Sequence, residues 1–198
     1  MALNVTVVSH PLLAAKLACI QDRTTDSATM RRLVAQAAQI ITVSATASLQ
    51  PGQNCALVPL MRSGLAMVDA VLELLVPGNK VVVHHLGLFR QRSQKTSLEA
   101  VEYYNNIPTT KPPVEHAFIV DPLLATGTTS VAAIDTLKEW GVGEITFIAL
   151  IATQKGLERA AKVWPGKVKF FVGAIEELDE SGHITPGVGD IGDRLYFN

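Results

Sequence analysis

The sequence predicts an α/β fold in which a mainly parallel central sheet is flanked by helices. From Cys55 onward, short apolar runs alternate with helix-compatible segments, which is the pattern of parallel strands joined by crossover helices. Of the 198 residues, 48% are hydrophobic, which is enough to build a sizeable core. We therefore expect residues 1–198 to form a single domain.

Apolar spacing predicts two helices before the first of these runs. Pro11 suits the first turn of a helix, and apolar side chains follow it at positions 12, 13, 17 and 20. Asp26 can cap a second, longer helix that runs to about Thr46, because its apolar side chains also recur at helical spacing. Pro51 and Gly52 end this section.

The later apolar runs are expected to form the strands of the sheet, at residues 56–60, 80–84, 116–120, 144–152 and 168–172. Helices fit residues 65–75, 130–140 and 157–164, since a glycine or a Pro-Gly pair follows each of these segments. The polar stretch 87–111 is predicted to be a long loop or a hairpin. The glycine-rich tail after Gly182 is predicted to be irregular.

Charge and composition argue against several classes of protein. A net charge of -1 is unlike a protein whose main partner is nucleic acid, because phosphate binding usually leaves a basic excess. Cys19 and Cys55 are isolated, so neither a disulfide framework nor a structural zinc site is indicated. No apolar stretch approaches the roughly 20 residues of a membrane helix. We expect a cytoplasmic protein without nucleic-acid or membrane partners.

The most informative segment follows the apolar run 116–120. It consists of Asp121, Pro122, Leu123, Leu124, Ala125, Thr126, Gly127, Thr128 and Thr129. Backbone N–H groups at a helix N-terminus attract an anion, hydroxyls add hydrogen bonds, and Gly127 permits close approach. Asp121 at the strand end can hold ribose hydroxyls or a hydrated Mg²⁺. The segment therefore predicts a cradle for a phosphorylated sugar, with a simple helix cap as the alternative.

Two further strands are followed by cationic loops. Arg62 and Ser63 come directly after residues 56–60 and before a helix, which places a guanidinium beside free N–H groups. Arg90, Arg92 and Lys95 follow residues 80–84. Because ligands of α/β sheets bind at the carboxyl ends of the strands, we expect these loops to share the site of the phosphate cradle.

Taken together, these segments resemble the uracil phosphoribosyltransferases, which have the type I phosphoribosyltransferase fold. The similarity runs from Ser9 to the C-terminus. Its motifs, in family order, are VPLMRSGL at 58–65, GLFR at 87–90, VEYY at 101–104, the 121–129 loop, and ITPGVGDIGDR at 184–194. The tail also contains G-x-G-x-x-G at 187–192, but a dinucleotide site is rejected because only 6 residues follow and no βαβ unit fits.

The resemblance implies transfer of ribose 5-phosphate from phosphoribosyl pyrophosphate (PRPP) to N1 of uracil, which gives UMP and pyrophosphate in pyrimidine salvage. It implies that residues 121–129 hold the ribose 5-phosphate and that Arg62 and Arg90 meet the pyrophosphate. It also implies that Ile184, Gly189, Asp190 and Ile191 form an irregular base-binding segment, with Asp190 near base and sugar. Mg²⁺ is the implied cofactor, bound mainly through PRPP and near Asp121 rather than by direct protein ligands. Relatives are homodimers or homotetramers, and the same is expected here.

Three positions depart from the family pattern. Thr128 stands where a glycine is usual, Ile191 where alanine is usual, and His183 where tyrosine is usual. Ile191 could narrow the base pocket or face the core. Other functions therefore stay open: a nucleotide-sensing regulator of the same fold, a transferase for another base, or a degenerate copy.

Overall fold

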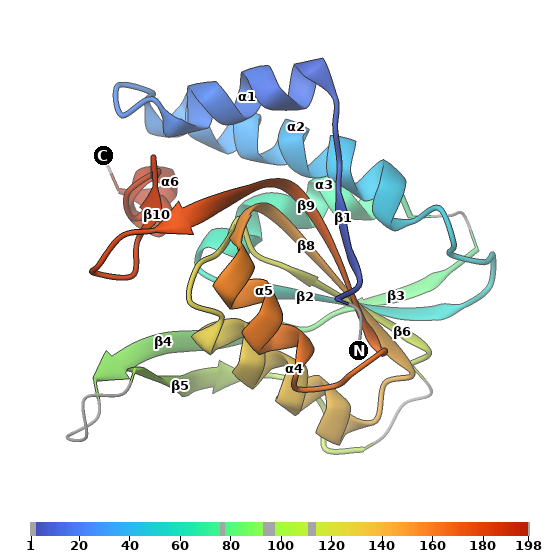
Figure 1. Cartoon of the computed structure of the whole chain (residues 1–198). Coiled ribbons are helices and arrows are strands. Elements are labelled where there is room, and N and C mark those ends of the chain that lie inside the picture. Colours follow the sequence, from blue (N-terminus) through green and yellow to red (C-terminus); the bar gives the residue numbers. More distant parts are fainter. Residues whose placement is uncertain (1–2, 76–77, 93–97, 111–113, 198) are drawn as a thin grey trace.

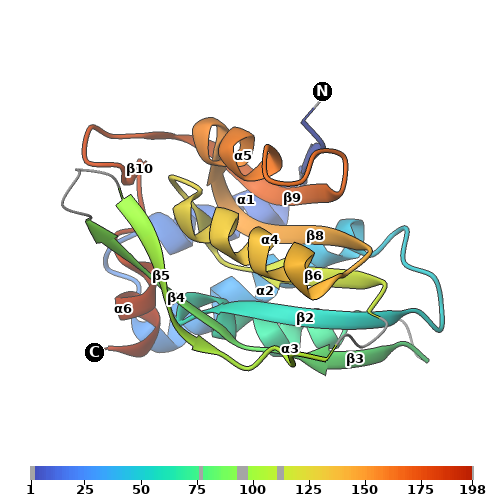
Figure 2. The same ribbon diagram turned by 90° about the horizontal axis from the view of Figure 1, so that it is seen from below.

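The protein is a three-layer α/β structure. The computed structural model describes residues 3–75, 78–92, 98–110 and 114–197. One face of the central sheet is covered by α1 (Pro11–Gln21), α2 (Ser27–Ala45) and α3 (Val68–Leu72), as Figure 1 shows. The opposite face is covered by α4 (Thr128–Trp140) and α5 (Gln154–Ala161), which lie in front of the sheet in Figure 2. This arrangement confirms the predicted fold class.

The main sheet path runs β1-β9-β8-β6-β2-β4-β5. These strands are β1 (Val5–Val7), β9 (Val168–Leu178), β8 (Glu144–Thr153), β6 (His116–Val120), β2 (Asn54–Met61), β4 (Leu86–Arg92) and β5 (Leu98–Asn105). All neighbours on this path pair in parallel except β4 and β5. Every residue of β6 is buried, because helices cover both faces of the sheet, and its sequence is therefore continuously apolar rather than alternating.

Three short strands complete the sheet. Strand β3 (Lys80–Val83) pairs in parallel with the first half of β2, and β7 (Leu123–Leu124) pairs in parallel with β8. Strand β10 (Ile184–Thr185) pairs antiparallel with β9. In the polar stretch 87–111, β4 and β5 pair antiparallel, which agrees with the hairpin that was one of the two predictions; residues 93–97 and 111 lie outside the described part of the chain.

The N-terminal helices begin where the sequence predicts. Pro11 is the first residue of α1, and the Asp26 side chain caps α2 by accepting a hydrogen bond from the Thr29 backbone N–H at 2.9 Å. Met30, Val34 and Ile41 are fully buried against the sheet, which confirms the helical apolar spacing of α2. The Asp26 cap satisfies one of the otherwise unpaired N–H groups of the first turn.

Three helices differ from their predicted limits, and α4 begins at Thr128, two residues before the predicted start at 130. The segment expected as a helix over 65–75 is a 3-10 helix, Ser63–Met67, followed by the short α3. Helix α5 begins three residues before the predicted start at 157, because the Thr153 side chain caps it and accepts from the Gly156 N–H at 3.0 Å. Thr153 is also the last residue of β8, directly after the apolar run 144–152, so the sequence alone does not mark it as a helix cap.

The tail is more ordered than predicted. After β10 it forms α6 (Ile191–Tyr196), capped by the Asp190 carboxylate, which accepts from the Asp193 N–H at 3.0 Å. Figure 1 shows α6, β10 and the β4–β5 hairpin at the same end of the sheet. Among the described helices, none combines the length and apolar character needed to cross a membrane.

Candidate active site

A cleft of about 810 Å³ opens at the carboxyl ends of the parallel strands. Its walls come from the loop after β2, the β4–β5 hairpin, the loop between β6 and α4, and the tail after β9. The predicted site residues that line it are Arg62, Asp121, Leu123, Ala125, Thr126, Gly127, Thr129, Ile184, Gly189, Asp190 and Ile191. The three segments predicted from separate parts of the sequence therefore meet in one cleft.

The 121–129 segment, hereafter the phosphate loop, leads from β6 into α4. Gly127 precedes the first helical residue with φ 75°, in the left-handed region that favours glycine. A Cβ on Gly127 would lie 2.7 Å from the Gly156 carbonyl oxygen, so a larger residue has no room. The first N–H groups of α4 have no partner within the helix, and they adjoin Thr126, Gly127 and Thr129 in the cleft wall.

Three members of the phosphate loop do not line the cleft. Leu124 is 1% exposed and belongs to the core, while the Pro122 carbonyl accepts from the backbone N–H groups of Leu150 and Ile151. Thr128 is the first residue of α4 and is 3% exposed. Its helical backbone needs no positive φ, so a threonine fits at this position without backbone strain. Leu124 and Thr128 can therefore shape the site without their side chains facing the cleft.

The loop after β2 lies beside the phosphate loop. Strands β2 and β6 pair in parallel with Pro59 opposite Val120, so the segments that follow them are neighbours. The Ser63 hydroxyl donates to Asp121 Oδ1 at 2.9 Å, and the Asp121 residue is only 8% exposed. This bond fixes a nearly buried carboxylate at the strand end, between the two loops.

Arg62 is held at the rim of the cleft by the C-terminal helix. Its Nη2 donates to Asp193 Oδ1 at 2.7 Å, and its Cζ lies 4.8 Å from the centroid of the Phe197 ring. The Arg62 side chain is 43% exposed, and a guanidinium carries several N–H donors, so donors remain for an anion. Arg90 lies on β4, but its side chain is outside the described part of the structure, and its role stays a prediction.

Arg194 ties the tail to the end of α1. Its Nη1 donates to the Ile20 carbonyl at 2.7 Å and to the Val188 carbonyl at 2.9 Å, and its Nη2 donates to the Asp22 carbonyl at 2.5 Å. These partners are as many as 174 residues away in sequence, so no local pattern could reveal them. The guanidinium thereby fixes the tail loop that contains Gly189.

Ile191 faces the core. Its side chain is 5% exposed and packs in the cluster that includes α2, so it reaches the cleft from the buried side. Gly187 and Gly189 both have φ 72°, which lets the tail turn sharply between β10 and α6. The Thr185–Pro186 and Met61–Arg62 peptide bonds are cis.

His183 lies at the lip of the cleft in a hydrogen-bonded turn. The Ser181 hydroxyl is 2.6 Å from Asp179 Oδ1 and 2.7 Å from His183 Nδ1. Hydrogen bonds from the Ser181 side chain and the His183 backbone hold the pKa of the Asp179 carboxyl below its usual value. An ionised carboxylate only accepts, so Ser181 donates to it and accepts from Nδ1–H. Neutral His183 then carries its lone pair on Nε2.

Other residues of the cleft were assigned no role from the sequence, although Phe89 and Tyr103 belong to the GLFR and VEYY motifs. Phe89 and Tyr103 face each other across the β4–β5 hairpin, with ring centroids 6.1 Å apart, and Arg23 lines the cleft from the α1–α2 turn. Within the described ranges, no group of three or more His, Cys, Asp or Glu side chains could hold a metal ion.

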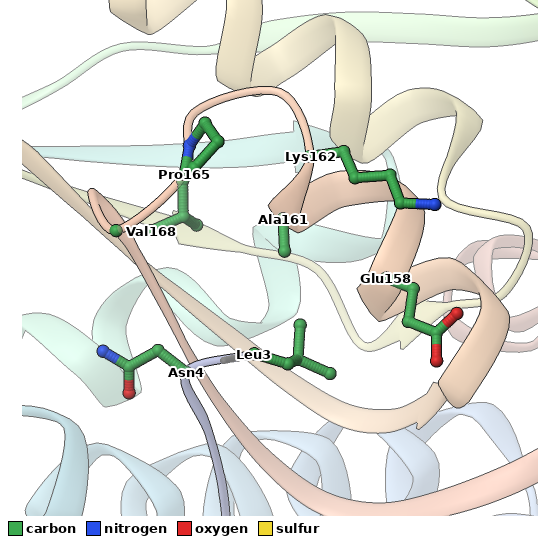
Figure 3. Close-up of a pocket in the computed structure, with 8 residues that line it drawn as sticks. Leu3, Asn4, Glu158, Ala161, Lys162, Pro165 and Val168 are labelled. Carbon is green, nitrogen blue, oxygen red and sulfur yellow. The ribbon is translucent and has the colours of Figure 1, made fainter. Parts of the chain in front are cut away.

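A smaller hollow of about 360 Å³ lies elsewhere on the molecule. Figure 3 shows Leu3, Ala161 and Val168 around it, with Glu158 and Lys162 at its edge. Val168 is the first residue of β9, whereas the large cleft lies at the carboxyl ends of the strands. The two hollows are therefore at different ends of the sheet.

Comparison with known proteins decides the family. The family model described as uracil phosphoribosyltransferase matches residues 46–198. The chain belongs to the uracil phosphoribosyltransferase family. Among its relatives, urg2 of Schizosaccharomyces pombe is 38% identical over 98% of this chain and 90% of its own length. Uracil phosphoribosyltransferase of Lachnoclostridium phytofermentans is 37% identical and covers 98% of each chain.

Solved structures share the fold of this chain. The AQ2163 protein from Aquifex aeolicus superposes with a TM-score of 0.85 at 27% identity, and the match covers 97% of both chains. An adenine phosphoribosyl transferase from Trypanosoma brucei, in complex with AMP, pyrophosphate and ribose-5-phosphate, has a TM-score of 0.58 at 12% identity. That match covers 92% of this chain and 88% of the other, and it shows the shared phosphoribosyltransferase fold.

Proposed function

We propose that the protein is a uracil phosphoribosyltransferase that converts uracil and PRPP to UMP and pyrophosphate. One observation carries the proposal: the phosphate loop, the Arg62 loop and the glycine-rich tail line a single cleft of about 810 Å³. Each of the three parts of the products, phosphorylated ribose, pyrophosphate and base, then has a candidate subsite. Family membership supports the same reaction.

In this proposal, the phosphate loop binds the 5-phosphate. N–H groups at the start of α4 and the hydroxyls of Thr126 and Thr129 supply the hydrogen bonds. Asp121, held by Ser63, faces the ribose hydroxyls. The sugar is thereby oriented with its anomeric carbon toward the middle of the cleft.

Breaking the bond at the anomeric carbon builds positive charge on the sugar and negative charge on pyrophosphate. A fixed cation beside the leaving group stabilises this transition state more than the ground state. Arg62 has that role, and Arg90 joins it in our assignment. The substrate is the magnesium complex of PRPP, and the nearly buried Asp121 carboxylate fits a contact with its hydrated ion.

Uracil is flat and uncharged, so backbone groups of the tail can read its alternating donors and acceptors. Backbone N–H and C=O groups of Ile184 and Gly189 are assigned to this task, with Asp190 between base and sugar. The positive φ of Gly189 allows the close approach that backbone recognition needs. His183 lies beside this segment at the lip of the cleft.

The reaction is tested by incubating folded protein with uracil, PRPP and Mg²⁺ and measuring UMP. Cytosine, hypoxanthine and guanine are offered in competition. We expect UMP as the main product. UMP no higher than in an enzyme-free control would refute the proposal, and preferred turnover of another base would assign a different transferase. Binding of UMP and RNA without turnover would instead identify a regulator.

The oligomeric state is proposed from the family resemblance alone. We infer a homodimer or homotetramer, and light scattering of the purified protein measures its mass against the 21.2 kDa of one chain. A mass of one chain across micromolar concentrations would contradict this.

A further inference from the structure

Arg159 on α5 contacts the phosphate loop from outside the cleft. Its Nη1 donates to Thr128 Oγ1 at 2.8 Å and lies 3.4 Å from the Thr126 carbonyl oxygen. The Thr126 and Thr128 hydroxyls are themselves 3.1 Å apart. Thr126 lines the cleft, whereas Thr128 is buried between the loop and α5. A chain of polar groups therefore runs from Arg159 to the cleft wall.

The start of α5 is packed against the same loop. The Thr153 hydroxyl donates to the Ala125 carbonyl at 2.6 Å while it caps α5. A Cβ on Gly156 would overlap the Ala125 carbonyl oxygen, so the two backbones touch. Arg159, one turn further along α5, therefore extends from a fixed platform, and its reach to the loop is set by backbone contacts.

The donor and acceptor roles follow from chemistry. A guanidinium only donates, so the Thr128 oxygen accepts from Arg159. The Thr128 O–H is then available to donate to the Thr126 oxygen, which leaves the Thr126 O–H to donate into the cleft. Successive hydrogen bonds polarise one another, and a cation at the far end makes the last O–H a better donor to an anion.

We propose that Arg159 is a positioning residue for the 5-phosphate of the sugar substrate, acting through Thr128 and Thr126. This inference rests on the proposed function, because it takes the cleft to bind a 5-phosphorylated ribose. It also assigns a purpose to Thr128. A glycine at this position would carry only a hydrogen atom, whereas the Thr128 hydroxyl connects the phosphate loop to the Arg159 guanidinium on α5. The residues assigned to the pyrophosphate and the base are on other segments: Arg62 follows β2, and Ile184 and Gly189 belong to the tail.

The test compares four single variants, and the double variant Arg159→Ala with Thr128→Val, by titration calorimetry with ribose 5-phosphate and, separately, with pyrophosphate. Arg159→Ala removes the cation, and Thr128→Val removes the hydroxyl while keeping the shape. Thr128→Ser keeps the hydroxyl. Lys155→Ala removes an exposed cation from the first turn of the same helix and controls for net charge.

We expect Arg159→Ala and Thr128→Val each to weaken ribose 5-phosphate binding about 3- to 10-fold, the range of a partly exposed hydrogen bond. The double variant should bind ribose 5-phosphate no more weakly than the single variant with the lower affinity, because the two substitutions interrupt the same chain of groups. Pyrophosphate affinity should not change. Thr128→Ser should recover most of the lost affinity, and Lys155→Ala should bind like the wild type. In turnover, KM for PRPP should rise while KM for uracil stays constant.

Unchanged ribose 5-phosphate affinity in Arg159→Ala would overturn the inference, even if its melting temperature fell. Equal weakening of ribose 5-phosphate and pyrophosphate, or additive effects in the double variant, would overturn it too. A wild type that binds ribose 5-phosphate but forms no UMP would refute the proposed function and leave the role of Arg159 standing. The binding and turnover measurements therefore separate the two failures.

Discussion

Replacing Arg194 by Met should loosen the tail and weaken uracil binding. The wild-type guanidinium donates to the carbonyls of Ile20, Val188 and Asp22, and a methionine fills similar space without donors. At about 1 kcal/mol for each hydrogen bond in this partly exposed position, the docked tail loses about 2 to 3 kcal/mol. That loss corresponds to about a 30- to 150-fold increase in local opening.

Two assays report this opening. Amide hydrogen exchange over residues 184–195 should accelerate about 30- to 150-fold, while exchange in the β6 and β8 strands changes little. KM for uracil should rise about 10-fold or more, with a smaller change in KM for PRPP, because the tail is the assigned base subsite. Arg32→Met is the control, since Arg32 is exposed and, within the described residues, its side chain donates to Thr29 of the same helix. Unchanged tail exchange in Arg194→Met would refute the reasoning.

Three further predictions concern the loop, the core and the leaving-group site. Gly127→Ala should lower the free energy of unfolding in urea by about 2 kcal/mol or more. Gly52→Ala is the control: Gly52 also has a positive φ but has open space around it, so the loss should be only about 1 kcal/mol. Equal losses in the two variants would contradict the close contact at Gly127. Burial lowers the pKa of His116, so the unfolded chain binds more protons, and stability should fall as the pH drops from about 7 to 5. His116→Gln should flatten that slope in urea unfolding, and an unaltered slope would count against it. Arg62→Ala should lower kcat/KM for PRPP about 100-fold but shift the melting temperature by only about 2 °C, because its ion pair is exposed; near-wild-type turnover would disprove its assignment.

Local signals predicted most of the fold. Continuous apolar runs mark buried parallel strands, and Asp26 marks the start of α2, because both depend on residues close in sequence. Strand β1 was not predicted, because it has only 3 residues and is defined by its pairing with β9, far along the chain. Helix α6 was not predicted, because it has only 6 residues and one of them is a glycine. Its packing against α2 and the Asp190 cap stabilise its helical conformation.

The candidate site also has a part that the sequence predicts and a part that it does not. The meeting of the phosphate loop and the Arg62 loop could be predicted, because parallel neighbours bring their carboxyl ends together. The bonds of Arg159 and Arg194 could not, since each joins residues that no periodicity relates. Both arginines act from outside the cleft on backbone or hydroxyl groups, and no local sequence pattern identifies those partners.

Helix α6 links two of the proposed subsites. Asp190 caps it within the base segment, and Asp193, one turn later, holds Arg62 at the assigned leaving-group site. Arg194 then fixes the same helix to the end of α1. Because the helix has only 6 residues, it cannot shift at one end without moving the other. A loosened tail therefore releases Arg62 as well as the base contacts, so Arg194→Met should lower kcat in addition to raising KM for uracil, whereas an independent base loop would leave kcat unchanged.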